Sequence, residues 1–277
     1  MLSESFGESW LELDFPFPCE IHYRTPRRLE PNANYRVLVV HTEPSPLCIP
    51  FETIAPFAHF FDLIIASNPQ FAALPNALID SFGGCWATRL PQKKEFSASF
   101  LYSLGVAGAV FMNGYAFRIG IYESASLIKI PMRMFRGRSM PEGMAADLPP
   151  PTNGVKDCLF ESMFSLSIEN NSEENYFTEK LVDCFATYTV PIYYGCTNIG
   201  RHFNTDGMIL VKDHHEAINV LNALSPEDYW ARVPFLRENF LASQKFWEGS
   251  SLRIRNAILQ SKEKQMRGMP LSDPKEG

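Results

Sequence analysis

The sequence predicts an α/β protein. Strand and helix patterns alternate along most of the chain, and no internal repeat or low-complexity block interrupts them. The 277 residues, 45% of them hydrophobic, suffice for one large core or two small ones.

The N-terminal third carries the first series of elements. Strands are expected there at residues 35–41, 62–67 and 84–90. Pro91 and the basic pair Lys93 and Lys94 then have the composition of a linker. We therefore predict a first domain over residues 1–91 and a second over 92–262.

The second series begins with a unit that often cradles phosphates, namely a strand, a glycine loop and a helix. The strand is expected at 96–102, the loop runs through Gly105, Gly108 and Gly114, and the helix covers about 115–126. A further strand is expected at 127–135, and the proline- and glycine-containing stretch 137–153 has the length of a binding loop.

The clearest pattern lies between residues 164 and 194. Apolar residues alternate with polar ones over 164–169, which predicts a strand whose carboxyl end carries Glu169 and Asn170. A polar loop precedes a predicted helix over 176–188, with an apolar stripe on one face and Tyr176, Glu179, Lys180 and Asp183 on another. The next strand, 190–194, contains Pro191, which favours an exposed sheet edge.

These polar residues gather where an α/β protein binds its ligands. In an open parallel sheet, ligands collect beyond the carboxyl ends of the strands, because helix N-termini there favour anions. Glu169, Asn170, Tyr176, Glu179 and Lys180 are all expected at that edge.

The net charge argues against one class of function, and the cysteines indicate free thiols. A net charge of −6 and a pI near 5.6 argue against a large non-specific nucleic-acid surface, while a local basic pocket for a small polyanion stays open. The six cysteines form no CxxC pair and are expected to be reduced and mostly buried.

Neither end of the sequence carries a targeting or membrane signal, and the C-terminal end has the composition of a disordered tail. Residues 1–10 are acidic and polar, unlike a signal peptide, and no apolar run approaches the roughly 20 residues of a membrane span. The sequence is thus expected to be soluble. The stretch from Ser261 onward lacks an apolar period, so a disordered tail is expected, assigned as 263–277.

The segment SLSIENNSEENYFTEKLVDCFATYTVPIYYG, residues 165–195, resembles the signature of the α1,3-fucosyltransferase family. That pattern runs FEN, a short loop, YVTEK, a helix and PIYWG. Weaker similarity covers KKEFSASFLYS and the helix of Arg118, and TEPSPL followed by FDLIIASNP is similar to the family's acidic element. Phe177 and Tyr194 replace the family's usual Val and Trp.

The resemblance implies a GT-B fold, two Rossmann-like domains facing a cleft, with the acceptor held by the first domain and GDP-fucose by the second. Only about 40 residues precede Glu43, so the acceptor domain is expected to be shortened. An anchor-free form implies a cytoplasmic enzyme of bacterial or viral type, or a soluble form of a Golgi-type enzyme.

The resemblance also implies roles for single residues. Arg118 and Lys180 would bind the diphosphate, Tyr176 and Glu179 the nucleotide or its ribose, and Glu169 and Asn170 would line the sugar end. Glu43 occupies the position of the catalytic base. Glu52, in the same loop region and preceded by Phe51, is the rival base, and His41 is a weaker candidate.

The reaction implied is an inverting transfer of fucose from GDP-fucose to a hydroxyl of a glycan, with an α1,3-type linkage. The sequence contains no Asp-x-Asp pair that would bind a divalent cation, so no metal cofactor is expected. Two alternatives stay open: a non-catalytic nucleotide-sugar or glycan-binding protein with a GT-B donor domain, and a GT-B transferase for another nucleotide sugar. An uncovered sheet edge in a shortened domain would also allow a homo-oligomer.

Overall fold

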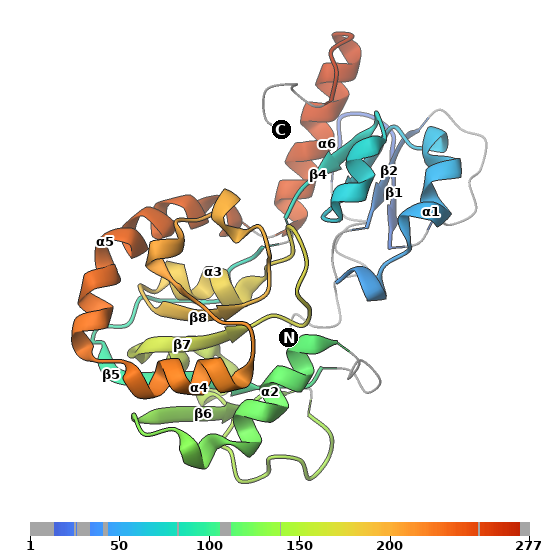
Figure 1. The fold of residues 1–277 in the computed structure, drawn as a ribbon. Coiled ribbons are helices and arrows are strands. Elements are labelled where there is room, and N and C mark those ends of the chain that lie inside the picture. The colour runs from blue at the N-terminus through green and yellow to red at the C-terminus, as the bar shows by residue number, and fades with distance from the viewer. Residues whose placement is uncertain are drawn as a thin grey trace. The chain divides into compact units, whose positions relative to one another are not determined.

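The computed structural model describes residues 14–24, 26, 34–40, 44–81, 83–105, 112–138, 140–248 and 250–271. These residues form two compact units, each with its own parallel sheet (Figure 1). The first unit takes the described residues of 1–82, 174–176 and 248–277, and the second takes 83–173 and 177–247. The boundary therefore lies at 82/83 instead of the expected 91/92, and the C-terminal segment packs with the first unit.

The first unit holds a four-stranded parallel sheet in the order β1-β2-β3-β4. Its strands are β1 (Cys19–Tyr23), β2 (Tyr35–Val39), β3 (Leu63–Ala66) and β4 (Ala77–Ile79). The expected strands at 35–41 and 62–67 are confirmed as β2 and β3. Strand β3 is a continuous buried apolar run, and β2 is apolar and buried apart from Arg36. The sequence analysis missed β1, which mixes polar and apolar residues, and β4, which has three residues.

Helices cover both faces of this first sheet. Ile54 of helix α1 (Phe51–Ile54) packs with Phe61, Phe71 and alternate residues of β2 and β3 on one face. On the other face, Ile254 and Ile258 of helix α6 (Ser250–Met266) pack with the remaining strand residues.

The expected disorder from Ser261 onward is wrong for residues 261–266. Helix α6 continues to Met266, and the Ser261 hydroxyl lies 2.6 Å from the Tyr35 hydroxyl in a buried hydrogen bond. The apolar positions that anchor the helix, Ile254 and Ile258, lie two turns and one turn before Ser261, so the stretch from Ser261 onward carries no apolar period of its own.

The second unit holds a five-stranded parallel sheet in the order β6-β5-β7-β8-β9. Its strands are β5 (Glu95–Tyr102), β6 (Met132–Arg136), β7 (Ser162–Ile168), β8 (Val190–Tyr194) and β9 (Ile209–Leu210). The strand expected near 84–90 is absent from the described residues of that stretch. The other expected strands are present, with β6 shorter than predicted.

Within the described residues, four α-helices cover this sheet. Helix α2 (Asn113–Glu123) leads from β5 to β6, and α3 (Glu179–Ala186) leads from β7 to β8 in the opposite direction. Right-handed crossovers that run in opposite directions place their helices on opposite faces. Helix α4 (His214–Ala223) contacts α2, and α5 (Pro226–Ser243) contacts α3, so each face carries a pair (Figure 1).

Strand β7 lies at the centre of the sheet and is buried along its whole length. The alternation of its residues predicted one polar face, and that face is buried too. Two of its three serines are matched by serines of β5: Ser97 pairs with Ser162 and Ser99 with Ser165, both at 2.9 Å between hydroxyl oxygens, whereas Ser167 Oγ has no partner within the described residues. Hydroxyls buried in this way need such partners.

The exposed edge expected at Pro191 is wrong, because β8 lies between β7 and β9. The Tyr194 carbonyl accepts from Glu169 on the β7 side, and the Tyr193 carbonyl accepts from Val211 on the β9 side. By alternation Pro191 faces β9, whose pairing begins only at Ile192. The missing N–H therefore removes no ladder hydrogen bond.

No helix in the described part of the chain combines the length and the apolarity that a bilayer crossing requires. All six cysteines lie among the described residues, and none forms a disulfide, as expected. The expectation that most of them are buried is wrong, because only Cys184 and Cys196 are buried and the other four are partly exposed.

The N-terminus of α2 packs directly on the backbone that follows β7. The Gly114 N–H donates to the Asn170 carbonyl at 3.1 Å, and a Cβ on Gly114 would lie 1.7 Å from the Glu169 carbonyl oxygen. Glycine at 114 is therefore required by close approach of two backbones.

We predict that Gly114→Ala lowers the free energy of unfolding by about 1–3 kcal/mol or more, because backbone and not a flexible side chain must move. Urea titration followed by circular dichroism measures this. Gly84→Ala is the matched control, since a Cβ there meets nothing within 4 Å. Equal stability of the two variants would contradict the close approach.

Candidate functional site

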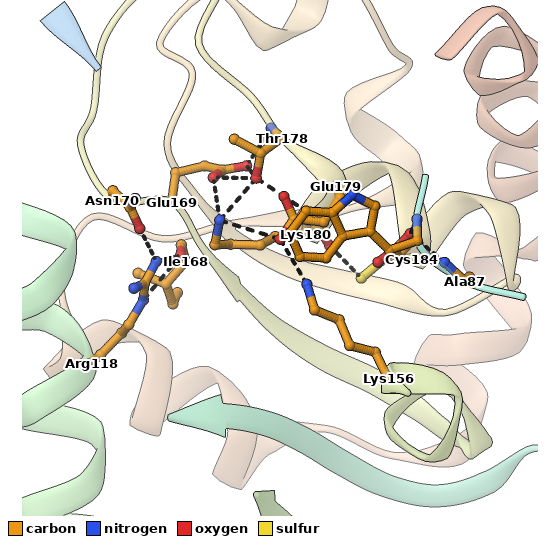
Figure 2. Close-up of polar contacts among 12 residues, drawn as sticks. Ala87, Arg118, Lys156, Ile168, Glu169, Asn170, Thr178, Glu179, Lys180 and Cys184 are labelled. Carbon is orange, nitrogen blue, oxygen red and sulfur yellow. Dashed lines mark hydrogen bonds and ion pairs between the residues drawn. The ribbon is translucent and has the colours of Figure 1, made fainter. Parts of the chain in front are cut away.

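Polar side chains cluster at the carboxyl ends of β5 and β7, where the order of the second sheet reverses (Figure 2). Such a reversal is the usual ligand site of an open α/β sheet, because loops diverge there and leave a crevice. Arg118, Glu169, Asn170, Glu179 and Lys180 all come from the elements that meet at this edge.

The Arg118 side chain joins the ends of the two central strands. Its Nη1 donates to the Ser103 carbonyl at 2.9 Å, and its Nε and Nη2 donate to the Ile168 carbonyl. Nη2 also donates to Asn170 Oδ1 at 2.8 Å. The guanidinium is buried and thereby fixes the Asn170 amide, as Figure 2 shows.

Glu169 is fully buried and accepts hydrogen bonds from the residue that caps α3. Its Oε1 accepts from the Thr178 N–H at 2.7 Å, and its Oε2 accepts from the Thr178 hydroxyl at 2.8 Å. The Lys180 ammonium lies 3.4 Å from Oε2 and supplies a counter-charge. A Cβ on Gly195 would lie 2.5 Å from Glu169 Cγ, so glycine leaves room for this carboxylate.

Glu179, the first residue of α3, is held between two lysines. Its Oε1 lies 2.7 Å from Lys156 Nζ and 3.6 Å from Lys180 Nζ. Burial acts to raise the pKa of Glu179, but the attraction of Lys156 and then of Lys180 outweighs it and holds the pKa well below its ordinary value. Glu179 is therefore ionised at neutral pH.

Lys156 and Trp86 also belong to this cluster, although neither was predicted from the sequence. Lys156 Nζ lies 4.2 Å from the centre of the Trp86 ring. Trp86 stands in the stretch expected to be a strand, and Lys156 follows a long loop, so neither position carried a pattern that indicated the contact.

Asp183 anchors the segment that carries Trp86. Its Oδ1 accepts from the Trp86 N–H at 2.6 Å and from the Ala87 N–H at 2.9 Å, and its Oδ2 has no hydrogen-bond partner within the described residues. Burial raises the pKa of Asp183 to about 6, against the opposing effects of Lys156 and the two N–H groups.

The structure brings together five of the six predicted donor-site residues. Arg118 contacts Asn170, and Glu169, Glu179 and Lys180 share one network. Tyr176 is buried but lies before the helix, in the segment 174–176 that clusters with the first unit. Helix α3 begins at Glu179 instead of Tyr176, because Thr178 caps it.

Of the candidate bases, only Glu52 lies among the described residues. Glu43 and His41 lie outside the described residues. Glu52 lines a pocket of about 240 Å³ in the first unit, next to the carboxyl ends of β2 and β3. Its polar lining includes Ser67, Asn68 and Gln70, and its apolar lining includes Phe51 and Phe71.

Among the residues that the structure describes, no three His, Cys, Asp or Glu side chains come together as a metal site. The polar groups of the candidate site include lysines, carboxylates and hydroxyls. Metal independence stays a prediction.

Residues 136–229, about a third of the chain, match the model of glycosyltransferase family 10 (fucosyltransferase), C-terminal part. The alpha-(1,3)-fucosyltransferase FucT of Helicobacter pylori is 33% identical over 69 residues, a stretch that spans 24% of this chain and 14% of the Helicobacter protein. The resemblance that the sequence indicated is confirmed. The matched segment contains Lys156, Glu169, Asn170, Glu179 and Lys180, whereas Arg118 and Glu52 lie outside it.

Solved structures share the fold. A crystal structure of α1,3-fucosyltransferase with GDP has a TM-score of 0.53 at 17% identity, over 89% of this chain and 77% of that one. The enzyme with GDP-fucose gives 0.52 at 19%, over 84% and 75%. Anabaena HepE with UDP-glucose gives 0.56 at 10%, over 83% and 72%. The expected α/β fold of GT-B type is confirmed.

We predict that Lys156→Met lowers the free energy of unfolding at pH 7 by about 1.5–3 kcal/mol, the range for a hydrogen bond to a charged group. The variant leaves Glu179 buried with Lys180 as its remaining cation. Adding Glu179→Gln to the variant should recover part of the loss, since no buried charge is then left.

The ion pair between Lys156 and Glu179 should also change how the free energy of unfolding depends on pH. Because folding lowers the pKa of Glu179, its contribution is complete above the unfolded-state pKa of about 4.3 and is lost as pH falls through the folded-state value. In Lys156→Met the folded-state pKa of Glu179 should lie closer to the unfolded-state value, so less stability should be lost on acidification than in the parent. Urea titrations from pH 7 to pH 3 measure this loss, and parallel curves would contradict the assignment.

Proposed function

We propose that this protein is an inverting glycosyltransferase that moves fucose from GDP-fucose to a hydroxyl of a glycan, forming an α1,3-type linkage. The observation that carries the proposal is the match of residues 136–229 to the fucosyltransferase C-terminal domain, together with the cluster around Glu179 and Lys180 inside it. The fold likeness to fucosyltransferases solved with GDP and GDP-fucose supports the donor class.

Lys180 is assigned to the donor diphosphate. Its side chain is 26% exposed, against 17% for Lys156, so it is the more accessible of the two cations beside Glu179. When the bond between fucose C1 and the phosphate oxygen breaks, negative charge develops on the departing GDP, and a fixed cation stabilises it. Lys156 then serves to keep Glu179 ionised and in place as an acceptor for the ribose hydroxyls.

Arg118 is assigned to positioning as well as to the diphosphate. Its donors to the Ser103 and Ile168 carbonyls hold the two strand ends together, and its bond to Asn170 fixes the amide at the sugar end. Arg118→Ala removes these contacts along with any phosphate contact. Lys180 is therefore the cleaner residue for a binding test.

The acceptor is assigned to the pocket beside Glu52. A volume of about 240 Å³ lies below the roughly 300–1,000 Å³ of pockets for drug-sized ligands and suits a small sugar unit. The acceptor hydroxyl attacks fucose C1 from the side opposite GDP, GDP leaves with the bonding electrons, and a carboxylate takes the hydroxyl proton. Glu43 and Glu52 are the two candidates for that carboxylate.

The direct test is turnover without metal. We expect the protein with GDP-fucose, a glycan acceptor and EDTA to release GDP, and to release less with GDP-mannose or UDP-galactose. Binding of GDP-fucose without release supports the non-catalytic alternative. Turnover of another sugar nucleotide in preference supports a transferase of different donor specificity, and a strict need for magnesium or manganese contradicts metal independence.

The Lys180 assignment has its own measurement. Lys180→Ala should weaken GDP-fucose binding by about 1.5–3 kcal/mol in titration calorimetry, because it removes a charge-assisted contact. Lys262→Ala, in helix α6 of the other unit, is a control for the loss of one positive charge. Unchanged affinity of Lys180→Ala would remove Lys180 from the donor site.

The base is identified by paired variants. We expect Glu43→Gln to lower the transfer rate by a factor of order 10² to 10⁴ with GDP-fucose affinity nearly unchanged, because the amide cannot take a proton. Glu52→Gln is the matched comparison. If Glu52→Gln is the inactive variant, the base is Glu52, and if both stay active the acceptor assignment is wrong.

A further inference from the structure

Trp86 is an exposed aromatic residue with a cation on its ring. Its surface is 54% exposed, and Lys156 Nζ lies 4.2 Å from the ring centre. Lys156 is in turn 2.7 Å from Glu179. One lysine side chain therefore connects the indole to the carboxylate that the proposed function assigns to the ribose.

The backbone around Trp86 is fixed although it belongs to no helix or strand. The N–H groups of Trp86 and Ala87 donate to the buried carboxylate of Asp183. Two residues later the Thr88 N–H donates to Asp157 Oδ1 at 2.9 Å, and the Thr88 hydroxyl donates to Oδ2. Two buried carboxylates thus hold an irregular segment that presents a large apolar side chain to solvent.

The exposed half of the indole contributes no burial to the fold, so that part of the ring is available to a ligand. A fixed aromatic ring binds a planar group without further loss of conformational freedom. The segment has the properties of a preorganised binding surface.

The charges around the indole select the kind of ligand. Lys156 already supplies the cation for the ring, so a second cation is disfavoured there. A neutral planar ring is favoured, because stacking on an aromatic side chain depends on the π face that every nucleobase has. A base lies next to the ribose in any nucleoside diphosphate, and Glu179 marks the ribose position.

We propose that Trp86 is the stacking platform for the nucleobase of the donor. The assignment rests on the proposed function, because it takes the ribose position from Glu179. It adds a binding residue outside the segment that matches the fucosyltransferase model, in the stretch between the last strand of the first unit and the first strand of the second.

The test uses GDP and inorganic pyrophosphate as probes on the full chain. Trp86→Leu keeps apolar cover on Lys156 but has no π face, and Trp86→Phe keeps an aromatic ring. We expect Trp86→Leu to raise the Kd for GDP roughly 5- to 150-fold, the span of base–aromatic stacking measured by side-chain removal. Trp86→Phe should recover part of this, and pyrophosphate affinity should stay unchanged in both.

Direct contact is tested by tryptophan fluorescence. We expect GDP, but not pyrophosphate, to change the emission of the parent and of Trp230→Phe, and this change to disappear in Trp86→Phe. Trp230 is the matched control, since it is 61% exposed on α5. A GDP-induced change that persists in Trp86→Phe overturns the platform.

The remaining outcomes separate this inference from the proposed function. If the parent binds GDP in calorimetry and Trp86→Leu binds it equally well, the platform is wrong and the donor site stands. Equal weakening of GDP and pyrophosphate by Trp86→Leu shows an effect through Lys156 and also overturns stacking. If the parent binds no GDP, the proposed function fails, and the platform with it.

Discussion

The buried carboxylate of Glu169 is the interaction on which the site depends. It follows β7 directly and accepts both the N–H and the hydroxyl of Thr178, the residue that caps α3. A carboxyl group buried away from solvent needs hydrogen-bond partners, so the loop between Glu169 and Thr178 must bring the two residues together. Helix α3 therefore starts at a fixed point, and Glu179 and Lys180 are placed by the same contact.

Around that contact the charges are nearly balanced. Lys156 and Lys180 face Glu169 and Glu179, and Arg118 is bound to carbonyl oxygens and an amide. A balanced cluster holds its lysines in place before any anion arrives, whereas an excess of positive charge would attract every polyanion. If the cluster binds the donor as proposed, discrimination between nucleotides rests on shape and on the group that stacks or hydrogen-bonds beside the phosphates.

The sequence predicted the parts of this arrangement that depend on local pattern. Strands β2, β3, β5, β7 and β8 follow apolar runs, and the loop after β7 carried Glu169 and Asn170 to the expected edge. Contacts between distant segments could not be predicted. Lys156 contacts Glu179, 23 residues away in the sequence, and Trp86 contacts Asp183, 97 residues away. The periodicity of apolar residues contains no information on such pairs. Arg118 was predicted as part of the site, but its burial and its hydrogen bonds to backbone carbonyls were not predicted.

The return of helix α6 to the first sheet has a consequence for how the protein is made. The second unit is continuous apart from the short segment 174–176, whereas the first needs residues near both ends of the chain. During synthesis, the apolar face formed by Tyr35, Val37 and Ile65 cannot be covered until Ile254 and Ile258 have left the ribosome. The second unit can therefore fold first, and the first unit exposes that apolar face until helix α6 has been synthesised, a period in which a chaperone could bind it.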